Sequence, residues 1–479
     1  MESIWTQTVH MPSFPSLEGH READVAIIAG GQAGILTAHA LRQAGAEVVV
    51  LEANRICSGQ TAGTTAKLTA QHGLKYHQLI ETLGFDAASQ YAAANLKAVE
   101  HLRTLVQTRS IDCAFRDCTA FLYAVEAPGP LQDEYDACCQ LGMDVFLTRN
   151  TELPFSAQAL GLRQQAHFHP LKLLAALAQN LTIFEHSRVL EVEGHTLRTN
   201  LGTVTAQTIL FTCHYPFLNV PGYYFLRQHQ ERSYVLALEG ITPFQDYYLG
   251  IDGEMLSFRP YGNVLLLGGS GHRTGENRQG HNYEELAKAA KRYFPQSNIS
   301  IRWSAQDCIP MDGVPYIGQY AESRPDWLVA TGFQKWGMTS SVVASMVLSD
   351  LAQGREPMRE ASVFSPHRFH MGASVKQLTD DTVHAVRGLG RRLLEPSRIS
   401  TEDLPIGHGG VVEVDGEKLG VYRDQKDQLF AISVKCPHLG CQLEWNPAEK
   451  SWDCPCHGSR FGEDGKLLDT PAIRDLEER

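Results

Sequence analysis

Long apolar runs are absent from this 479-residue chain. No stretch approaches the roughly 18–20 consecutive apolar residues that a membrane helix needs. The first residues, 1–17, also lack the basic start and apolar core of a secretory signal. We therefore expect a cytoplasmic protein without a membrane span.

An excess of positive charge is absent as well. The formal net charge is −12, which argues against a nucleic-acid partner and favours simple solubility. One local basic cluster, Arg387, Arg391, Arg392 and Arg398, is the exception. We interpret it as a solvated helix face, with a docking site as the alternative.

Regularly spaced cysteines are absent before residue 430, as are internal repeats and low-complexity tracts. The chain has eleven cysteines, of which the last four cluster near the C-terminus. The scattered ones are most simply free thiols in a reducing compartment. The length predicts two or three domains. The scattered cysteines are Cys57, Cys113, Cys118, Cys138, Cys139, Cys213 and Cys308.

A strand–turn–helix–strand unit opens the patterned part of the chain. Residues 25–28 form a short continuous apolar run, which is typical of a buried parallel strand. Residues 35–43 are predicted to be helical, and Gly45 is well placed to end that helix. Residues 47–51 give the second strand, so the pattern predicts one βαβ unit.

The turn of this unit reads Ala29-Gly30-Gly31-Gln32-Ala33-Gly34. Glycines here make the tight turn, let a pyrophosphate approach the backbone and let the helix pack on the strand. The helix N-terminus attracts the phosphates. Glu52 ends the second strand, where its carboxylate can accept hydrogen bonds from a ribose hydroxyl. Ala29 replaces the first glycine of the fingerprint, and we expect it to tolerate the turn only with a negative φ.

Two later segments favour FAD over NAD. Residues 58–67, SGQTAGTTAK, carry small side chains that leave backbone donors free for more pyrophosphate and the ribityl chain. Residues 312–318 read DGVPYIG, and a predicted strand at 327–330 runs into TGFQKWGMT and a helix ending near Gly354. A second glycine turn before a helix N-terminus again favours a negative ligand.

In this order and at this separation, the three segments resemble the D-amino-acid oxidase superfamily of FAD-dependent oxidoreductases, over about residues 22–365. The resemblance implies an α/β Rossmann-like FAD-binding domain with an inserted α+β substrate domain. It also implies oxidation of a C–N bond by hydride transfer to the flavin. No residue clearly offers covalent FAD attachment. The implied cofactor-binding residues are Gly30, Gly31, Gly34, Glu52, Gly63, Thr64, Thr65, Val189 (through its backbone), Gly332, Gly337 and Met338.

The C-terminal cysteines lie in two loops that each pair cysteine with histidine, CPHLGC at 436–441 and CPCHGS at 454–459. A Rieske 2Fe–2S centre has two thiolates on one iron and two imidazoles on the other. A structural zinc site is the rival, but zinc fingers pair cysteines and then histidines. Residues 403–479 resemble the Rieske family and predict a small all-β domain with one cluster. The predicted metal ligands are Cys436, His438, Cys454 and His457.

The same resemblance gives roles to four neighbouring residues. Cys441 and Cys456 stand where Rieske proteins of cytochrome bc complexes carry a disulfide, and two free thiols are the alternative. Ser459 matches the serine that donates a hydrogen bond to a bridging sulfide. Phe461 stands where high-potential members have tyrosine, so one donor to a cysteine sulfur is missing. We expect a midpoint potential below the upper end of the roughly −150 to +300 mV Rieske range.

Together the two sites predict a dehydrogenase that oxidises an amine or amino acid and passes single electrons through the cluster to an external carrier. The alternatives are a pure oxidase, the reverse flow from cluster to flavin, and a non-catalytic electron-transfer or redox-sensing module. A Rieske oxygenase is disfavoured. Residues 381–384, DTVH, begin its usual iron motif, but the fifth position after His384 is Leu389 rather than histidine.

No residue in the sequence is a clear catalytic base. The weak catalytic candidates are Lys67, His72, His272 and Trp336, and each also fits a structural or flavin-contacting role. Arg259 or Arg273 could clamp a substrate carboxylate through two hydrogen bonds, although a surface ion pair is the interpretation we favour for either.

The expected domain order has four parts. Residues 1–20 form an N-terminal lead-in, and residues 21–370 form the oxidoreductase. Its FAD-binding part is discontinuous, at about 21–110, 160–215 and 300–365, with the substrate part between. Residues 371–398 form a helical linker around a polar helix at 373–395, and Pro396 marks its end. Residues 399–479 form the Rieske domain.

Overall fold

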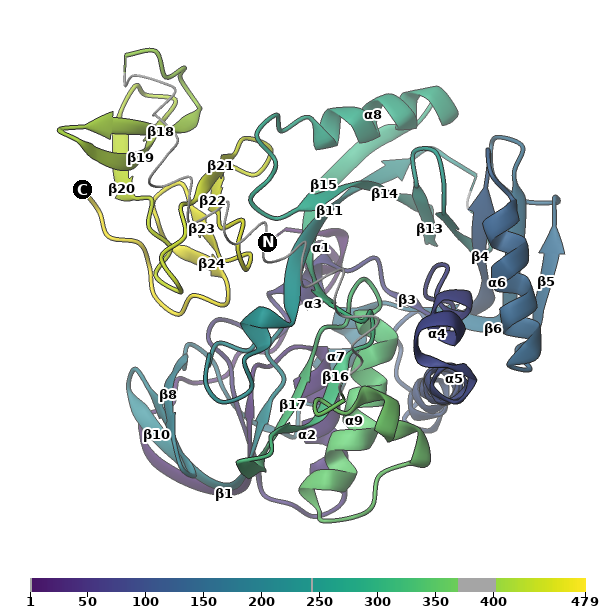
Figure 1. The fold of residues 1–479 in the computed structure, drawn as a ribbon, viewed down its shortest axis with the longest axis horizontal. Coiled ribbons are helices and arrows are strands. Elements are labelled where there is room, and N and C mark those ends of the chain that lie inside the picture. Colours follow the sequence, from purple (N-terminus) through teal and green to yellow (C-terminus); the bar gives the residue numbers. More distant parts are fainter. Residues whose placement is uncertain (1, 243, 369–401) are drawn as a thin grey trace.

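The computed structural model describes residues 2–242, 244–368 and 402–479. The expected linker helix at 373–395, the basic cluster around Arg391 and the DTVH segment at 381–384 lie outside the described residues. The described parts form two large sheets with their helices and a separate small β domain (Figure 1).

The first large sheet is the Rossmann-like sheet predicted from the sequence. Its strand order is β16-β17-β10-β1-β2-β7, and all neighbours from β17 to β7 are parallel, whereas β16 is antiparallel to β17. A hairpin of β8 and β9 extends it from β10. The strands are β1 Gly19–Ile28, β2 Val48–Leu51, β7 Thr182–Phe184, β8 Val189–Glu193, β9 Thr196–Thr199, β10 Gly202–Phe211, β16 Tyr316–Ala321 and β17 Arg324–Thr331.

The second large sheet has nine strands in the order β15-β11-β14-β13-β12-β4-β6-β3, with β5 also paired to β6. Its long antiparallel strands β11, β14 and β15 form one end, which α8 covers (Figure 1). The strands are β3 Lys67–Leu68, β4 Arg116–Ala124, β5 Val145–Thr148, β6 Gln158–His167, β11 Gln228–Glu239, β12 Tyr247–Gly250, β13 Ser257–Tyr261, β14 Val264–Arg273 and β15 Asn298–Pro310.

The helices cover these sheets, and α2 packs against α9 beside the first one. Two consecutive helices, α4 and α5, follow β3 in the chain. The helices are α1 Ile4–Thr8, α2 Gln32–Gln43, α3 Gln60–Gly63, α4 Tyr76–Leu83, α5 Phe85–Thr108, α6 Gly129–Gln140, α7 Pro170–Ala178, α8 Asn282–Tyr293 and α9 Gly337–Ala352, with short 3-10 turns at Tyr224–Leu226 and Arg359–Phe364.

The C-terminal domain is all β, as expected. A three-stranded sheet, β18-β19-β20, is followed by a four-stranded sheet, β21-β22-β23-β24. The four-stranded sheet lies nearer to β11 and β15 of the oxidoreductase part (Figure 1). The strands are β18 Gly409–Val414, β19 Glu417–Arg423, β20 Leu429–Ser433, β21 Glu444–Asn446, β22 Ser451–Asp453, β23 Arg460–Gly462 and β24 Leu467–Asp469.

The burial of β1 explains how the fold creates a ligand-binding edge. Only its last four residues, 25–28, are buried, and they pair with β2 on one side and β10 on the other. The carboxyl ends of these parallel strands and the N-terminus of α2 therefore meet at one edge. In open α/β sheets this edge is where ligands bind.

The N-terminal lead-in contains α1, which buries Trp5, and the indole Nε1 of Trp5 donates to the Thr64 carbonyl over 2.6 Å. One local expectation differs from the structure. Ala29 has φ +84°, so the expectation of a negative φ is wrong. Its carbonyl accepts from the Thr212 hydroxyl and its N–H donates to the Leu51 carbonyl. These bonds hold the strained turn, which disfavours any L-residue by roughly 1–2 kcal/mol.

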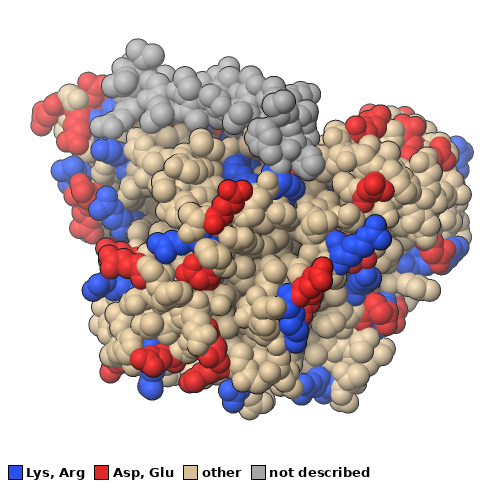
Figure 2. All heavy atoms as spheres, turned by 60° about the horizontal axis from the view of Figure 1, so that its bottom comes forward, with Lys and Arg blue, Asp and Glu red and all other residues tan. Residues whose placement is uncertain are grey.

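Charges of both signs are mixed on the surface. On the face drawn in Figure 2, Lys and Arg alternate with Asp and Glu, and the described residues form no broad area of one sign. Among the described helices, none combines the length and apolar character needed to cross a membrane.

Candidate functional site

A groove at the binding edge of the first sheet is formed by segments far apart in the sequence. Its volume is about 210 Å³, and a second cavity of about 160 Å³ adjoins it. The turn after β1, the segment around α3 and the start of α9 line the groove, while residues after β7 line the second cavity. Glu52, Gly59, Gln60 and His214 line both, so the two form one continuous site.

The groove suits a long ligand with a negative centre. The N-termini of α2 and α9 both open into it, and neither N-cap residue caps its helix with a side chain. Gln32 N donates to Thr61 Oγ1 over 3.1 Å, and the other N–H groups of the first turns suit phosphate oxygens. Two buried polar atoms in its lining, Gln32 Oε1 and Gln334 Nε2, have no hydrogen-bond partner in the described part of the chain. A dinucleotide cofactor would satisfy groups of this kind.

Glu52 is positioned by backbone donors at the junction of the two cavities. Its Oε2 accepts from Gly30 N and its Oε1 from Asn54 N, both over 2.8 Å. Burial raises the pKa of this carboxyl despite those bonds. Because Glu52 lines both cavities, its carboxylate is also available to a ribose hydroxyl of a bound dinucleotide.

The predicted FAD contacts divide into two groups. Gly31, Glu52, Thr64, Gly337 and Met338 line the groove, and Val189 lines the adjoining cavity. The second group lines neither the groove nor the adjoining cavity as described, and consists of Gly30, Gly34, Gly63, Thr65 and Gly332. Of these, Gly34 serves packing, because a Cβ there would lie 2.1 Å from the Ala29 carbonyl oxygen.

Sequence reasoning missed several polar groove residues. Gln306, Asp307, His214 and Lys335 line the groove from strand β15 and from loops. Burial raises the pKa of Asp307 to about 6, and burial lowers that of His214 to about 4. No local motif marks these residues, since only the fold brings them together.

The weak catalytic candidates lie outside the described groove lining. His72 stacks on Trp336 at 4.7 Å, and both its ring nitrogens are occupied, by the Tyr91 hydroxyl and the Thr69 carbonyl. His272 contacts the Tyr234 hydroxyl and its own neighbour's carbonyl. These contacts support structural roles for His72, Trp336 and His272.

Lys67 is the remaining candidate. Its Nζ donates to Ser257 Oγ over 2.5 Å and to Thr65 Oγ1 over 3.1 Å. Burial, followed by the nearby Arg259 guanidinium, lowers the pKa of Lys67 to about 7.

Two loops of the C-terminal domain fold in the same way. In the first, Cys436 N donates to the Cys441 carbonyl and Gly440 N to the Cys436 carbonyl, both over 2.9 Å. In the second, Cys454 N donates to the Ser459 carbonyl and Gly458 N to the Cys454 carbonyl. This repeated turn brings the side chains of both loops to a common centre.

The predicted ligands meet at that centre. The thiols of Cys436 and Cys454 lie next to each other, and the Ser459 hydroxyl lies beside Cys436. The imidazole rings of His438 and His457 lie 4.9 Å apart between centroids. The sulfurs therefore lie together and the imidazoles lie together, as two irons with different ligand pairs require.

The donor set fits a 2Fe–2S cluster. Nδ1 of His438 is buried, and none of the described residues forms a hydrogen bond with it. Burial lowers the pKa of His438 to about 4, so the imidazole is neutral, as a metal ligand must be. A different group, Cys441, Cys454 and Cys456, has its sulfurs within 4.8 Å of one another. Two of these sulfurs are joined to each other and offer no thiolate.

That bond is the expected Cys441–Cys456 disulfide, which is confirmed. It ties the two cluster loops across 15 residues of sequence. Phe461 is fully buried in the same apolar cluster as the loop cysteines.

The groove and the cluster loops are in direct contact through Gln306. Its backbone N donates to Gln60 Oε1 beside the groove, over 2.6 Å. Its side-chain Nε2 donates to the Gly458 carbonyl of the second cluster loop, over 2.8 Å, and to Gln230 Oε1, over 2.7 Å. A single residue thus links the two candidate sites.

Known protein families match both the oxidoreductase part and the C-terminal domain of the chain. Residues 24–351 match the family described as FAD dependent oxidoreductase (DAO), and residues 398–478 match the Rieske [2Fe-2S] domain. YhfW of Bacillus subtilis (strain 168), described as a Rieske 2Fe-2S iron-sulfur protein, is 35% identical over 495 residues, which covers 100% of this chain and 97% of that protein. The cytochrome b6-f complex iron-sulfur subunit of Nostoc punctiforme is 41% identical over 63 residues, 13% of this chain and 35% of that subunit.

Solved structures resemble the oxidoreductase part. Glycine oxidase from Geobacillus kaustophilus has a TM-score of 0.63 at 20% identity, over 73% of this chain and 99% of its own. L-proline dehydrogenase from P. horikoshii has a TM-score of 0.62 at 15% identity, over 74% and 99%. With a matching family over most of its length, the chain belongs to the DAO family of FAD-dependent oxidoreductases and carries a C-terminal Rieske domain, so its cofactors are FAD and a 2Fe–2S cluster.

Proposed function

We propose that this protein is a dehydrogenase that oxidises a C–N bond of an amine or amino acid and delivers the electrons singly to an external carrier. When bound, FAD takes a hydride from the substrate and the cluster takes one electron, so each substrate oxidised to an imine reduces two carrier molecules and releases protons to solvent. The contact of Gln306 with both the groove and the Gly458 carbonyl is the observation that carries the proposal.

The proposal assigns the cluster to Cys436, His438, Cys454 and His457. Replacing Cys454 or His457 by alanine is expected to abolish cluster binding, because each removes one of four bonds to iron. Iron analysis and the EPR signal of the reduced protein measure this, while the flavin absorbance should remain. Cys308→Ala, a buried free thiol of the oxidoreductase part, is the control. A His457→Ala protein with full iron content and an unchanged signal would contradict the assignment.

Two buried cations support a substrate that carries a carboxylate. Lys67 and Arg259 lie close enough for the Arg259 charge to lower the pKa of Lys67, after the larger effect of burial. Arg259 is buried and donates to the Phe168 carbonyl, but its Nε and Nη1 make no hydrogen bond. Neither cation is paired with a carboxylate among the described residues. We infer that an anionic substrate group compensates this charge.

Anaerobic titration with amino acids and with the matching amines tests this function. Amino acids are expected to bleach the flavin at lower concentration than amines and to develop the EPR signal of the reduced cluster in parallel. Lys67→Met is expected to lower the preference for amino acids over amines by roughly tenfold or more, because a charge-assisted hydrogen bond to the substrate carboxylate is lost. In the free protein the preference should fall as the pH rises through about 7, where Lys67 loses its proton.

The matched control is Lys288→Met, which changes an exposed lysine on α8. Flavin bleaching that never reaches the cluster would remove the proposed electron path. Failure of every amine and amino acid to bleach the flavin would remove the proposed reaction.

Phe461 sets an expectation for the cluster's potential. Phe461→Tyr is expected to raise the midpoint potential on the order of 60 mV, equivalent to about 1.4 kcal/mol, because a new O–H donor stabilises the reduced cluster. EPR-monitored redox titration measures this. Phe430→Tyr, at a side chain 41% exposed on β20, should leave the potential unchanged. A wild-type value near the top of the Rieske range would refute the role given to Phe461.

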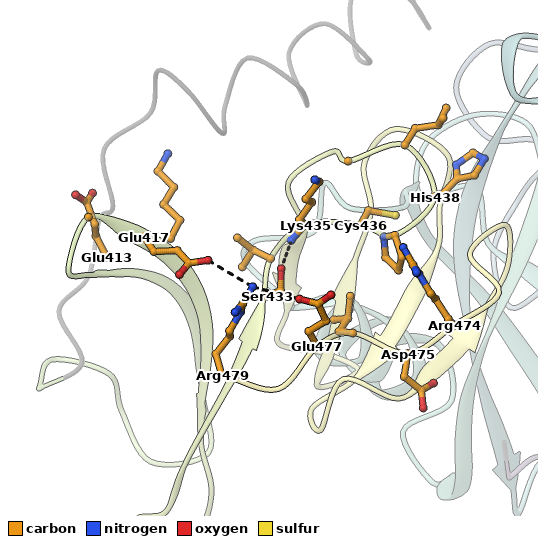
Figure 3. A pocket seen from close by; sticks show the side chains of 17 residues that line it. Glu413, Glu417, Ser433, Lys435, Cys436, His438, Arg474, Asp475, Glu477 and Arg479 are labelled. Atoms are coloured by element: carbon orange, nitrogen blue, oxygen red, sulfur yellow. Dashed lines mark hydrogen bonds and ion pairs between the residues drawn. The ribbon is translucent and has the colours of Figure 1, made fainter.

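We also propose where the external carrier takes its electron. A cavity of about 1010 Å³ opens beside the first cluster loop, and Figure 3 shows Cys436 and His438 at one end with Lys435 and Arg474 near them. Leu439, at the tip of this loop, is 42% exposed. The cations nearest the cluster favour a carrier with negative charge at its contact surface.

Charge reversal tests this surface. Lys435→Glu combined with Arg474→Glu is expected to slow reoxidation of the cluster by ferricyanide several-fold at low salt, with a smaller effect at high salt because exposed charges are screened. Lys426→Glu, at the exposed turn between β19 and β20, is the control. Equal rates for wild type and the double variant at low salt would place the exit elsewhere.

A further inference from the structure

The histidine side of the cluster site faces the oxidoreductase part of the same chain. Nε2 of His438 lies 2.7 Å from Asn219 Oδ1, in the loop after β10. With Nδ1 as the iron ligand, this Nε2–H donates to the Asn219 carbonyl oxygen. The ring of Phe225 stands edge-on to both imidazoles, with centroids 6.3 Å from His438 and 5.8 Å from His457. Both imidazoles therefore contact residues of the oxidoreductase part of the chain.

The second cluster loop is held by Gln230 on β11. Its Nε2 donates to the His457 carbonyl over 2.7 Å and to the Thr470 carbonyl over 3.0 Å. Gly458 lets the strand approach this closely, since a Cβ there would lie 2.6 Å from Gln230 Cβ. The loop therefore rests directly on β11, which pairs with β15, and Gln306 and Asp307 of β15 line the FAD groove.

A buried carboxylate joins the two parts beside these contacts. Glu449 of the Rieske domain forms an ion pair with Arg232 of β11 and accepts from Ser304 Oγ over 2.7 Å and Tyr283 OH over 3.1 Å. Arg460 of its own domain bonds the same carboxylate over 2.8 Å. Burial would raise the pKa of Glu449, but the two guanidinium groups lower it to about 2, so it stays ionised.

The Rieske domain also closes one end of the FAD groove. The adjoining cavity has Arg188 and Val189 on one side and Leu468, Thr470 and Ile473 of the Rieske domain on the other. Gln60 Nε2 donates to Asp469 Oδ1 over 2.8 Å across this boundary. With the pyrophosphate at the turn after β1, this end receives the adenosine of FAD.

We propose that the Rieske domain occupies one fixed position on the oxidoreductase part, a seat formed by the contacts of Asn219, Gln230 and Glu449. Asn219 and Gln230 hold the histidine side of the cluster toward the FAD groove. Glu449 fixes the domain over the adenosine end of FAD. The electron-transfer consequence rests on the proposed function. The retention of FAD by the seated Rieske domain does not rest on the proposed function, because FAD binding requires neither a substrate nor electron transfer.

The chemistry of the contact favours a fixed seat over a moving domain. Domains joined by a linker move unless their interface holds them. Here removal of one partner of a buried ion pair leaves an uncompensated charge, which is strongly unfavourable. The buried amide contacts of Gln230 would likewise lose their partners on separation. Asn219, Gln230 and Glu449 are therefore positioning residues for cluster and cofactor.

The first test uses the wild-type holoprotein and no substrate. Flash photoreduction of the flavin, followed at the cluster's absorbance, gives the rate of internal electron transfer in increasing glycerol. A fixed seat predicts a rate that changes by less than about twofold over roughly tenfold viscosity, since no domain motion precedes transfer. A rate that falls in proportion to viscosity overturns the proposal.

The second test compares Glu449→Gln with Glu417→Gln, a charge-matched change on β19 away from the seat. Glu449→Gln is expected to speed FAD dissociation, followed by flavin fluorescence, by about tenfold or more and to make internal transfer viscosity-dependent. Glu417→Gln should stay within about twofold of wild type. FAD release and transfer in Glu449→Gln that match the control overturn the proposal, and if this variant does not fold, the glycerol test on wild type decides.

Asn219→Ala gives an independent signature. Loss of the carbonyl acceptor makes the His438 imidazole a weaker donor to iron, so the midpoint potential of the cluster is expected to rise. Asn298→Ala, at an exposed residue on β15, is the control. An unchanged potential in Asn219→Ala contradicts the inward orientation of the cluster. If no amine is oxidised, the proposed function fails while FAD release and the potential still test the seat.

Discussion

The side chain of Gln306 is the point on which both halves of the protein depend. Its two N–H groups donate to Gln230 Oε1 and the Gly458 carbonyl, and its carbonyl oxygen accepts from Arg232 Nη1 and Thr274 Oγ1. A buried amide with all four hydrogen bonds made is rigid, and any substitution leaves several partners unsatisfied. Because Gln306 also lines the FAD groove, its position fixes the groove and the cluster loop relative to each other.

The contacts of Gln306 explain how the Rieske domain can work together with the flavin site, which the cluster ligands alone do not explain. A cluster that accepts one electron is of little use to a two-electron cofactor unless the two sites stay near each other. The seat of Asn219, Gln230 and Glu449 supplies that proximity, and the cavity beside Lys435 leaves a different side of the cluster loop open to solvent. In the proposed electron path, the flavin and the external carrier therefore approach the Rieske domain from different sides.

Local sequence patterns predicted the parts that depend on local spacing. The βαβ turn and the Cys–His loops each carry their signal within a dozen residues, and the resemblance of these loops to the Rieske family implied the Cys441–Cys456 bond. The seat could not be predicted in this way. Gln230 and Arg232 follow the ordinary alternation of residues along β11, so their sequence gives no sign of a special role. Their hydrogen-bond partners come from β15, through its register with β11, and from the Rieske domain, which is distant in sequence. Ala29 shows a further limit, because tertiary hydrogen bonds hold a φ that its residue type disfavours.

The most direct test of the central claim is a crystal structure of the protein loaded with both cofactors, with anomalous scattering at the iron edge. We expect two irons between the Cys–His loops, with the histidine-bound iron on the side of Asn219 and the FAD groove. We expect FAD to lie from the α9 end of the groove to the cavity beside Ile473. A histidine-bound iron turned toward solvent, or an FAD adenosine that the Rieske domain does not touch, would contradict the claim.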